Sequence, residues 1–113
     1  MGQVRLNAYR IMWVFVFFDL PVVTKKQRRK ATQFRKGLEK DGFTMLQYSV
    51  YIRHCASSES ADVHIKRTKK AVPEEGQVSI LVITDKQYGN IINIWGRKLE
   101  PLPPGQSNLN YFN

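Results

Sequence analysis

Two short segments of the chain carry β-branched and aromatic residues on both of their alternating sets of positions, and this pattern constrains the fold most strongly. Residues 11–18 read IMWVFVFF and residues 78–84 read VSILVIT. Asp19 and Pro21 follow the first segment, and Gly76 precedes the second. Both segments are therefore predicted to be core strands. A strand that is apolar on both sides needs cover on both faces of its sheet.

Helical periodicity begins soon after the first of these strands. Residues 24–27 (TKKQ) have the form of a capping box, which predicts the start of a helix. Ala31, Phe34 and Leu38 follow at the spacing of one apolar stripe. Gly42 stands where a helix commonly ends in a left-handed residue, so we expect the helix to end at residues 40–42.

The rest of the chain contains signals for further strands and helices. Residues 43–53 form either two strands or one long bent strand, because no Gly or Pro marks a turn inside them. A second helix is predicted from the serines of residues 57–60 to Pro73, with one face made by Ala61, Ile65, Thr68 and Val72. Residues 84–87 (TDKQ) predict a short helix, and residues 94–99 a further short strand.

The order of the main elements is β-α-β-β-α-β, which predicts an α+β, ferredoxin-like fold. In that fold both helices lie on one face of the sheet and leave the other face open. Because the core strands are also apolar on the open side, we expect a second sheet to pack there, most simply from an identical subunit in a homodimer. Residues 1–99 are predicted to form this single domain. Residues 100–113 are expected to be a tail that adds a C-terminal strand to the partner subunit or, alternatively, frays.

The charge of the chain is strongly positive and clustered. Eighteen Lys and Arg against nine Asp and Glu give a formal net charge of +9. Such an excess favours a polyanionic partner, namely DNA, RNA or anionic lipid. The clusters lie on the first predicted helix (Lys25, Lys26, Arg28, Arg29, Lys30, Arg35, Lys36 and Lys40) and on the second (Lys66, Arg67, Lys69 and Lys70).

These cations are expected to line the outer surface, because the apolar stripe of the first helix faces the sheet. A dimer would extend this surface along the phosphates of a duplex. No pattern for reading bases is present, so binding is predicted to be independent of nucleotide sequence. The predicted nucleic-acid-binding residues are Lys25, Lys26, Arg28, Arg29, Arg35 and Lys36. A solvated helix face without a ligand is the alternative.

Cys55 is the only cysteine, which excludes an intrachain disulfide and a site built on a cysteine pair. A lone thiol is typical of a reducing compartment. Residues 11–18 are too short to span a bilayer, which needs about 20 apolar residues. No small-residue cleavage site follows them, as it would in a signal peptide. We therefore expect a cytoplasmic protein without a membrane partner.

Asp19 is the candidate metal ligand, because a carboxylate at a strand end can bind Mg²⁺ together with waters and phosphate oxygens. One carboxylate is a poor metal site, whereas two copies meeting near a dimer axis could activate a water for phosphodiester cleavage. Alternatively, Asp19 only ends its strand. Ser49 is predicted to lie on a strand, where its hydroxyl could bond a phosphate or a metal-bound water, or simply be exposed. His54 and His64 are isolated, and we assign neither a catalytic role.

Four segments resemble those of a known family in the same order: residues 18–21 (FDLP), residues 34–38 (FRKGL) with 42–43 (GF), residues 47–51 (QYSVY) and residues 81–87 (LVITDKQ). Together they are similar to the Cas2 family, the small CRISPR-associated endonuclease and adaptation protein. The resemblance covers roughly residues 9–99.

The resemblance implies a ferredoxin-like homodimer that bridges two dimers of the CRISPR integrase and holds a duplex DNA prespacer. It also implies a metal-dependent nuclease acting on single-stranded RNA or duplex DNA, with Mg²⁺ or another divalent cation held by Asp19. In our leading hypothesis Ser49 assists there, and residues 100–113 are a candidate integrase-binding surface. Met45 and Leu46 stand where some members carry an arginine, which argues against strong RNA cleavage.

Two alternatives remain at this point. One is a free-standing, toxin-like ribonuclease of the same fold, which a neighbouring antitoxin gene rather than a CRISPR array and integrase gene would indicate. The other is a pure interaction module whose charge serves an acidic protein partner. A steep fall in DNA affinity with salt would argue against the second alternative.

Overall fold

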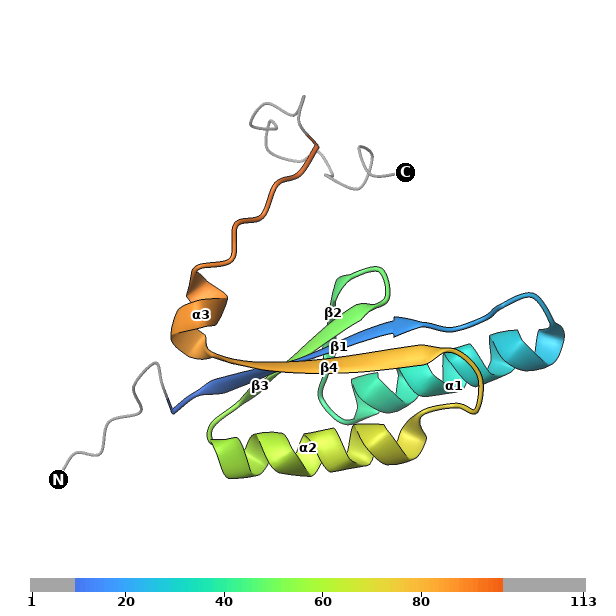
Figure 1. Ribbon diagram of the computed structural model, residues 1–113, viewed down its shortest axis with the longest axis horizontal. Coiled ribbons are helices and arrows are strands. Elements are labelled where there is room, and N and C mark those ends of the chain that lie inside the picture. Colours follow the sequence, from blue (N-terminus) through green and yellow to red (C-terminus); the bar gives the residue numbers. More distant parts are fainter. Residues whose placement is uncertain (1–9, 97–113) are drawn as a thin grey trace, which may run out of the picture.

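A four-stranded antiparallel sheet with two long helices on one face forms the framework of the chain (Figure 1). The computed structural model describes residues 10–96. In chain order its elements are β1 (Met12–Asp19), α1 (Lys25–Lys40), β2 (Thr44–Gln47), β3 (Val50–Cys55), α2 (Ser58–Ala71), β4 (Gln77–Thr84) and α3 (Asp85–Gly89). The strand order is β2-β3-β1-β4, which confirms the predicted α+β, ferredoxin-like fold. The predicted tail, residues 100–113, with its additional strand lies outside the described residues.

The central strand β1 divides its side chains between the two faces of the sheet. The buried cluster on the helical face consists of Val14, Val16, Phe18, Phe34, Leu38, Phe43, Tyr51, Cys55 and Ala61. Trp13, Phe15 and Phe17 alternate with the β1 members of this cluster, so they point to the opposite face. One set of apolar side chains of β1 therefore packs under the helices, and the other set lies on the open face of the sheet.

Helix α1 begins and ends where the sequence predicts. The Thr24 hydroxyl accepts a hydrogen bond from the Gln27 amide, and the Gln27 side chain accepts one from the Thr24 amide, each over 3.0 Å. As predicted, α1 buries one apolar stripe, formed by Ala31, Phe34 and Leu38. Gly42 has a φ of 92°, and a Cβ at this position would lie 2.9 Å from Nε of Arg53. The left-handed backbone therefore favours glycine here, and a Cβ would force the Arg53 side chain to move.

Residues 43–53 form two strands joined by a turn at Tyr48 and Ser49. Ser49 has a φ of 65°, the left-handed conformation that a tight hairpin turn requires. The prediction that Ser49 lies within a strand is wrong, because serine occupies the turn position usually taken by Gly or Asn. The Phe18 amide donates to the Ser49 carbonyl over 3.1 Å, which ties the turn to the end of β1.

Helix α2 is capped by Ser57, whose hydroxyl accepts from the Ser60 amide over 3.0 Å. The predicted face is confirmed in part. The buried residues of α2 are Ala61, His64 and Thr68, while Val72 is the C-cap and is exposed. The prediction that Val72 belongs to the buried face is wrong, because the helix ends one residue before it and the backbone turns to an extended conformation ahead of Pro73.

The open face of the sheet is covered at one end by α3, which lies on the side opposite α1 and α2 (Figure 1). The Trp13 ring stacks on Tyr88 with centroids 3.8 Å apart, and its Nε1 donates to Asp85 Oδ1 over 2.7 Å. Phe17 and Leu81 lie beyond this cover and stay exposed. Residues 94–96 form no strand, which contradicts the predicted strand there, and residues 97–99 lie outside the described part. No helix among residues 10–96 is long and apolar enough to cross a membrane.

Candidate nucleic-acid interface and metal-binding carboxylate

Asp19 is exposed at the last position of β1, on the open face of the sheet. It pairs across the sheet with Gln77, the first residue of β4. Gly76 packs against the backbone that leaves β1: a Cβ there would lie 2.8 Å from the Asp19 carbonyl oxygen and 3.0 Å from Cδ of Pro21. Gly76 also has a φ of 99°, a conformation that glycine adopts readily. Because it has no side chain, the two segments can approach closely, and this contact fixes the position of the Asp19 backbone.

Asp19 and Ser49 line the same shallow depression, so the structure brings together the two site residues predicted from the sequence. The depression has a volume of about 320 Å³ and is lined by Phe17, Phe18, Asp19, Tyr48, Ser49, Val50, Gln77 and Ser79. The hydrogen bond between the Phe18 amide and the Ser49 carbonyl joins its two sides. Tyr48, Gln77 and Ser79 also line the depression, and the sequence does not indicate this, because their approach to Asp19 depends on which strands flank β1.

The oxygen ligands that Asp19 offers fit a magnesium ion only when further ligands come from outside the described chain. Among residues 10–96, no group of three or more His, Cys, Asp or Glu side chains could hold a metal ion. Asp19 offers hard carboxylate oxygens, and it forms no ion pair with another described residue. Mg²⁺ commonly binds through one or two carboxylates and takes its other oxygens from water and phosphate. The carboxylate therefore fits such an ion when a phosphate, waters or a second copy complete the set.

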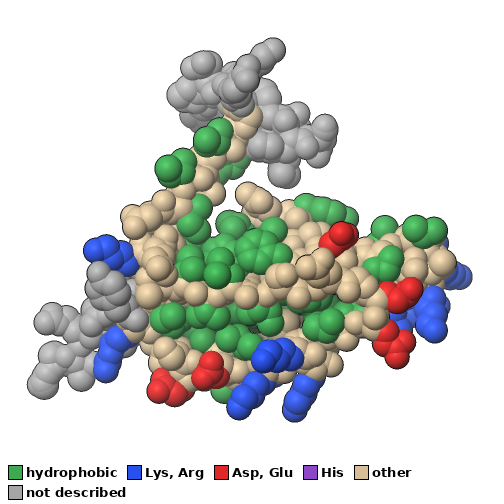
Figure 2. Space-filling view, in the orientation of Figure 1, with side chains coloured by type: hydrophobic (Ala, Val, Ile, Leu, Met, Phe, Trp, Pro, Cys, Tyr) green, Lys and Arg blue, Asp and Glu red, His purple; other side chains and the backbone are tan. Residues whose placement is uncertain are grey.

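The predicted cationic residues lie on α1, on the other side of the sheet from Asp19. Lys25, Lys26, Arg28, Arg29 and Lys36 are exposed. Arg28 also donates to the carbonyls of Val22 (3.2 Å) and Val23 (2.8 Å). Arg35 is partly buried and donates to Thr32 over 3.2 Å. Figure 2 shows Lys and Arg side chains together with some Asp and Glu on the helical side, apolar side chains above the sheet, and further Lys or Arg side chains at the α3 end.

Among residues 10–96, no lysine or arginine lines the Asp19 depression, so the structure does not bring the predicted cations to the predicted metal ligand. A larger groove lies between the first half of α1 and the end of α2, where Lys26 and Lys30 face Glu74 and Glu75. This groove contains both signs of charge. The basic surface and the Asp19 carboxylate therefore lie in two separate regions of the described fold.

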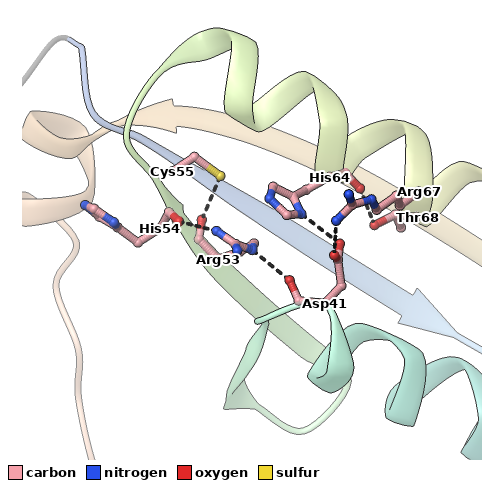
Figure 3. Close-up of polar contacts among 7 residues, drawn as sticks. All are labelled: Asp41, Arg53, His54, Cys55, His64, Arg67 and Thr68. Carbon is pink, nitrogen blue, oxygen red and sulfur yellow. Dashed lines mark hydrogen bonds and ion pairs between the residues drawn. The ribbon is translucent and has the colours of Figure 1, made fainter.

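A second aspartate, Asp41, is bound by residues from two other elements (Figure 3). His64 Nδ1 lies 2.8 Å from Asp41 Oδ2, and Arg67 Nη1 donates to Oδ1 over 2.7 Å. The ring nitrogen donates, because a carboxylate oxygen only accepts. Arg53 Nε donates to the Asp41 carbonyl over 2.7 Å. Burial raises the pKa of Asp41, but the hydrogen bonds from His64 and Arg67 outweigh it, so the pKa lies below its usual value of 3.8.

The segment that contains the sheet, Asp19 and the basic α1 is matched by the model of a protein family. The sequence model described as "CRISPR associated protein Cas2" matches residues 12–91, which include every strand and helix of the described fold. The chain belongs to the Cas2 family. This confirms the family proposed from the four sequence segments.

Curated Cas2 relatives extend the match over nearly the whole chain. The chain is 52% identical to the CRISPR-associated endoribonuclease Cas2 of Flavobacterium psychrophilum, over 83% of this chain and 82% of that one. It is 52% identical to the protein of the same name from Parvibaculum lavamentivorans, over 89% of this chain and 100% of that one. It is also similar to a solved crystal structure of Cas2, with a TM-score of 0.56 and 24% identity over 82% of this chain and 95% of that chain. The structural likeness supports the fold.

Proposed function

We propose that this Cas2 chain is a CRISPR adaptation protein that holds duplex DNA as a homodimer between dimers of the integrase. We further propose that it is a phosphodiester endonuclease that uses Mg²⁺ at Asp19. The observation that carries the proposal is the separation of a basic helical surface from an exposed carboxylate on the opposite face of one sheet. The first surface suits the phosphates of a duplex, and the second suits a metal ion. The endoribonuclease names of the relatives support the nuclease part.

The duplex is proposed to bind along α1. Lys25, Arg29 and Lys36 are exposed and form no side-chain hydrogen bond or ion pair with another residue of the described range, whereas Arg28 and Arg35 also hydrogen-bond within the chain. Side chains that neutralise phosphates release condensed counterions, so each neutralised phosphate steepens the salt dependence of binding. Interactions of this kind position a protein on a duplex without reading its sequence.

The homodimer is proposed to form through the open sheet face. Phe17 and Leu81 are 37% and 47% exposed there, on neighbouring strands. Apolar surface of this kind is stabilised when a partner covers it. A two-fold dimer uses the same patch on both subunits, and Asp19 belongs to that face, so each subunit would bring one Asp19 to the assembly.

The chemistry at Asp19 is proposed to be hydrolysis of a phosphodiester bond. Bound Mg²⁺ would polarise the phosphate and lower the pKa of an attacking water. Asp19 would hold the ion, and the Ser49 hydroxyl, in the same depression, would donate to a phosphate oxygen. Gly76 would keep the Asp19 backbone in place through the close approach described above.

Cleavage of labelled duplex DNA and single-stranded RNA with Mg²⁺ tests the nuclease proposal, with wild type compared to Asp19→Ala. We expect wild type to cut, Asp19→Ala to lose cleavage, and both to bind duplex equally. Duplex binding without any cleavage would remove the catalytic proposal and leave the scaffold. Cleavage of RNA without duplex binding would instead favour the free-standing ribonuclease.

The scaffold proposal is tested by the salt dependence of duplex affinity. The triple substitution of Lys25, Arg29 and Lys36 by Gln removes three exposed cations from α1, and Arg10→Gln removes one from the far end of β1 as a control. The slope of log affinity against log salt should become shallower by about 0.9 for each phosphate that the variant no longer neutralises. An unchanged slope in the triple variant, or an equal change per cation in the control, would contradict duplex binding along α1. Sedimentation with and without purified integrase measures the dimer and its partner.

A further inference from the structure

The groove between α1 and α2 has a volume of about 800 Å³ and has no part in the proposed function. The first turns of α1 extend past the end of α2 (Figure 1), so they face the last residues of α2 and the connection from Pro73 to Glu75. At the other end of α1, the Asp41 carboxylate accepts hydrogen bonds from His64 and Arg67 of α2. The two helices are therefore held together at one end and separated by the groove at the other.

Apolar side chains line the groove between its two walls. Phe34 of α1 and Leu20, which follows β1, contribute to this surface, and Ala71 and Val72 contribute to it where α2 ends. Val72 continues the apolar spacing of α2, yet it is 38% exposed. An amphipathic helix normally buries its apolar stripe against another element. The stripe of α2 therefore continues out of the core and into the groove.

Opposite charges stand on the two walls of the groove without pairing across it. Lys26 and Lys30 lie about one helical turn apart on α1, and Glu74 and Glu75 follow α2 on the other wall. None of these four side chains forms an ion pair with another residue of the described range. Glu75 accepts long hydrogen bonds from Gln27, over 3.4 and 3.5 Å. Figure 2 shows side chains of both signs close together where α1 begins.

This arrangement of charge favours a protein segment over nucleic acid in the groove. The α1 wall would attract the phosphates of a nucleic acid, but the two carboxylates opposite would repel them. A protein segment with side chains of both signs is complementary to both walls at once. Lys26 and Lys30 have the i, i+4 spacing at which one face of a helix also presents its side chains. An apolar surface between two helices suits the apolar face of a third helix.

We propose that this groove binds an amphipathic helix of a partner protein, which carries acidic side chains on one flank of its apolar face and basic side chains on the other. The acidic flank pairs with Lys26 and Lys30, and the basic flank pairs with Glu74 and Glu75. Residues 26–34 of α1 extend over about 12 Å, so the contact involves about two turns of the partner helix. A contact this short is typical of a transient partner. The proposal depends neither on duplex binding nor on cleavage.

Three synthetic helical peptides of about four turns test the proposal. They share one apolar stripe and carry Glu on one flank and Arg on the other, Glu on both flanks, or Arg on both flanks. Wild type should bind the mixed peptide about 3- to 10-fold more tightly than either of the other two, measured by NMR titration. The methyl signals of Leu20 and Val72 in the groove should shift, whereas those of Leu81 on the opposite face of the sheet should not.

Charge reversal of one wall at a time should change which peptide binds most tightly. Lys26→Glu combined with Lys30→Glu makes both walls acidic, so the peptide with Arg on both flanks should become the tightest ligand. Glu74→Lys combined with Glu75→Lys makes both walls basic, so the peptide with Glu on both flanks should take that place. Unfolding in urea shows that each variant is folded before it is titrated.

Lys66→Glu combined with Lys69→Glu is the matched control, because it makes the same change of charge at exposed positions of α2 outside the groove. This control should keep the wild-type preference, and an equal change of preference in it would overturn the proposal. A wild-type preference for the peptide with Glu on both flanks would mean that the net charge of +9, and not the groove, attracts peptides.

The position of the shifted methyl signals decides between the groove and other surfaces. Shifts at Leu81 in place of Val72 would move peptide binding to the open face of the sheet. Larger shifts of Val72 with a DNA duplex than with any peptide would make the groove a nucleic-acid site. Either result, or failure of all three peptides to bind, would overturn the proposal and leave duplex binding along α1 and cleavage at Asp19 to their own tests.

Discussion

Asp19 and Asp41 are two carboxylates at the ends of secondary-structure elements, and their surroundings differ completely. Asp41 caps the end of α1 and receives hydrogen bonds from His64 and Arg67 of α2, while its backbone carbonyl binds Arg53 of β3. Asp19 ends β1 in solvent and forms no ion pair with another residue of the described range. The Asp41 carboxylate joins the end of α1 to α2, and its backbone carbonyl adds β3, whereas the Asp19 carboxylate accepts no hydrogen bond from another described residue.

The difference separates a carboxylate whose oxygens are occupied within the fold from one that is open to a ligand. A carboxylate that is saturated by neighbouring donors cannot take a metal ion without breaking hydrogen bonds that hold helices together. An exposed carboxylate beside a depression has no such bonds to break. We therefore expect that replacing Asp41 lowers the free energy of unfolding, and that replacing Asp19 lowers the proposed cleavage activity.

Asp41→Ala is expected to have the largest effect on stability. It leaves His64, which is 7% exposed, without a partner for its ring nitrogen, and it frees Arg67. Removing one member of a buried charged pair is costly, but the Arg67 side chain is 61% exposed and adds little. The expected loss is about 2 kcal/mol in the free energy of unfolding, measured with urea.

Asp62→Ala is the matched control for this experiment, since Asp62 is an exposed aspartate on α2. Its replacement should change the free energy of unfolding by less than about 0.5 kcal/mol. If Asp41→Ala were no more destabilising than Asp62→Ala, the hydrogen bonds to His64 and Arg67 would contribute nothing to the fold.

Gly76→Ala is expected to have the next largest effect, because it disturbs the support of Asp19. The new Cβ would lie 2.8 Å from the Asp19 carbonyl oxygen at a residue with a φ of 99°. A left-handed alanine costs about 1 kcal/mol, and the steric overlap adds to it. We expect a loss of roughly 1–2 kcal/mol in stability and weaker cleavage. Gly37→Ala is the control: nothing lies within 4 Å of a Cβ there, so this helix substitution should raise stability by about 0.5–1 kcal/mol.

The pH dependence of unfolding gives a smaller effect of known sign. The pKa of Asp41 is lower in the folded chain than its usual 3.8, because the raising effect of burial is outweighed by the hydrogen bonds from His64 and Arg67. The resulting stabilisation is complete above the unfolded pKa and is lost as the pH falls through the folded pKa. The stability difference between wild type and Asp41→Asn should therefore be constant above about pH 5 and shrink below pH 3.8. A difference that stayed constant down to pH 2 would contradict the lowered pKa.

Local signals in the sequence predict the helices and strands of this fold, but they do not predict all the contacts between these elements. The Thr24 capping box, the apolar stripe of α1 and the left-handed Gly42 depend on residues within a few positions of one another, and all three are confirmed. The sequence does not reveal the Ser49 turn, because its left-handed residue is neither Gly nor Asn. His64 looks isolated in the sequence, since its partner Asp41 lies 23 positions away.

The candidate site follows the same division. Asp19 could be chosen from the sequence because it ends a strand. Ser49 could be chosen because it belongs to residues 47–51, one of the four segments that resemble the Cas2 family. Gln77 and Ser79 come beside Asp19 only because β4 pairs with β1 in an antiparallel register. The amino-acid sequence alone does not show which residues of β4 pair with which residues of β1. Tyr48 gave no signal either, because nothing in its neighbours indicates that its ring stays exposed.

Asp19→Asn is expected to have the smallest effect on stability, and it tests the comparison most directly. The substitution keeps the shape of the side chain and removes its charge, at a position without an ion pair in the described fold. The free energy of unfolding should therefore change by less than about 0.5 kcal/mol, measured with urea beside Asp41→Asn. Cleavage should disappear at the same time, because an amide is a poor ligand for Mg²⁺ in place of a carboxylate. A destabilisation as large as that of Asp41→Asn would mean that the Asp19 carboxylate supports the fold, and its exposure would then no longer argue for chemistry.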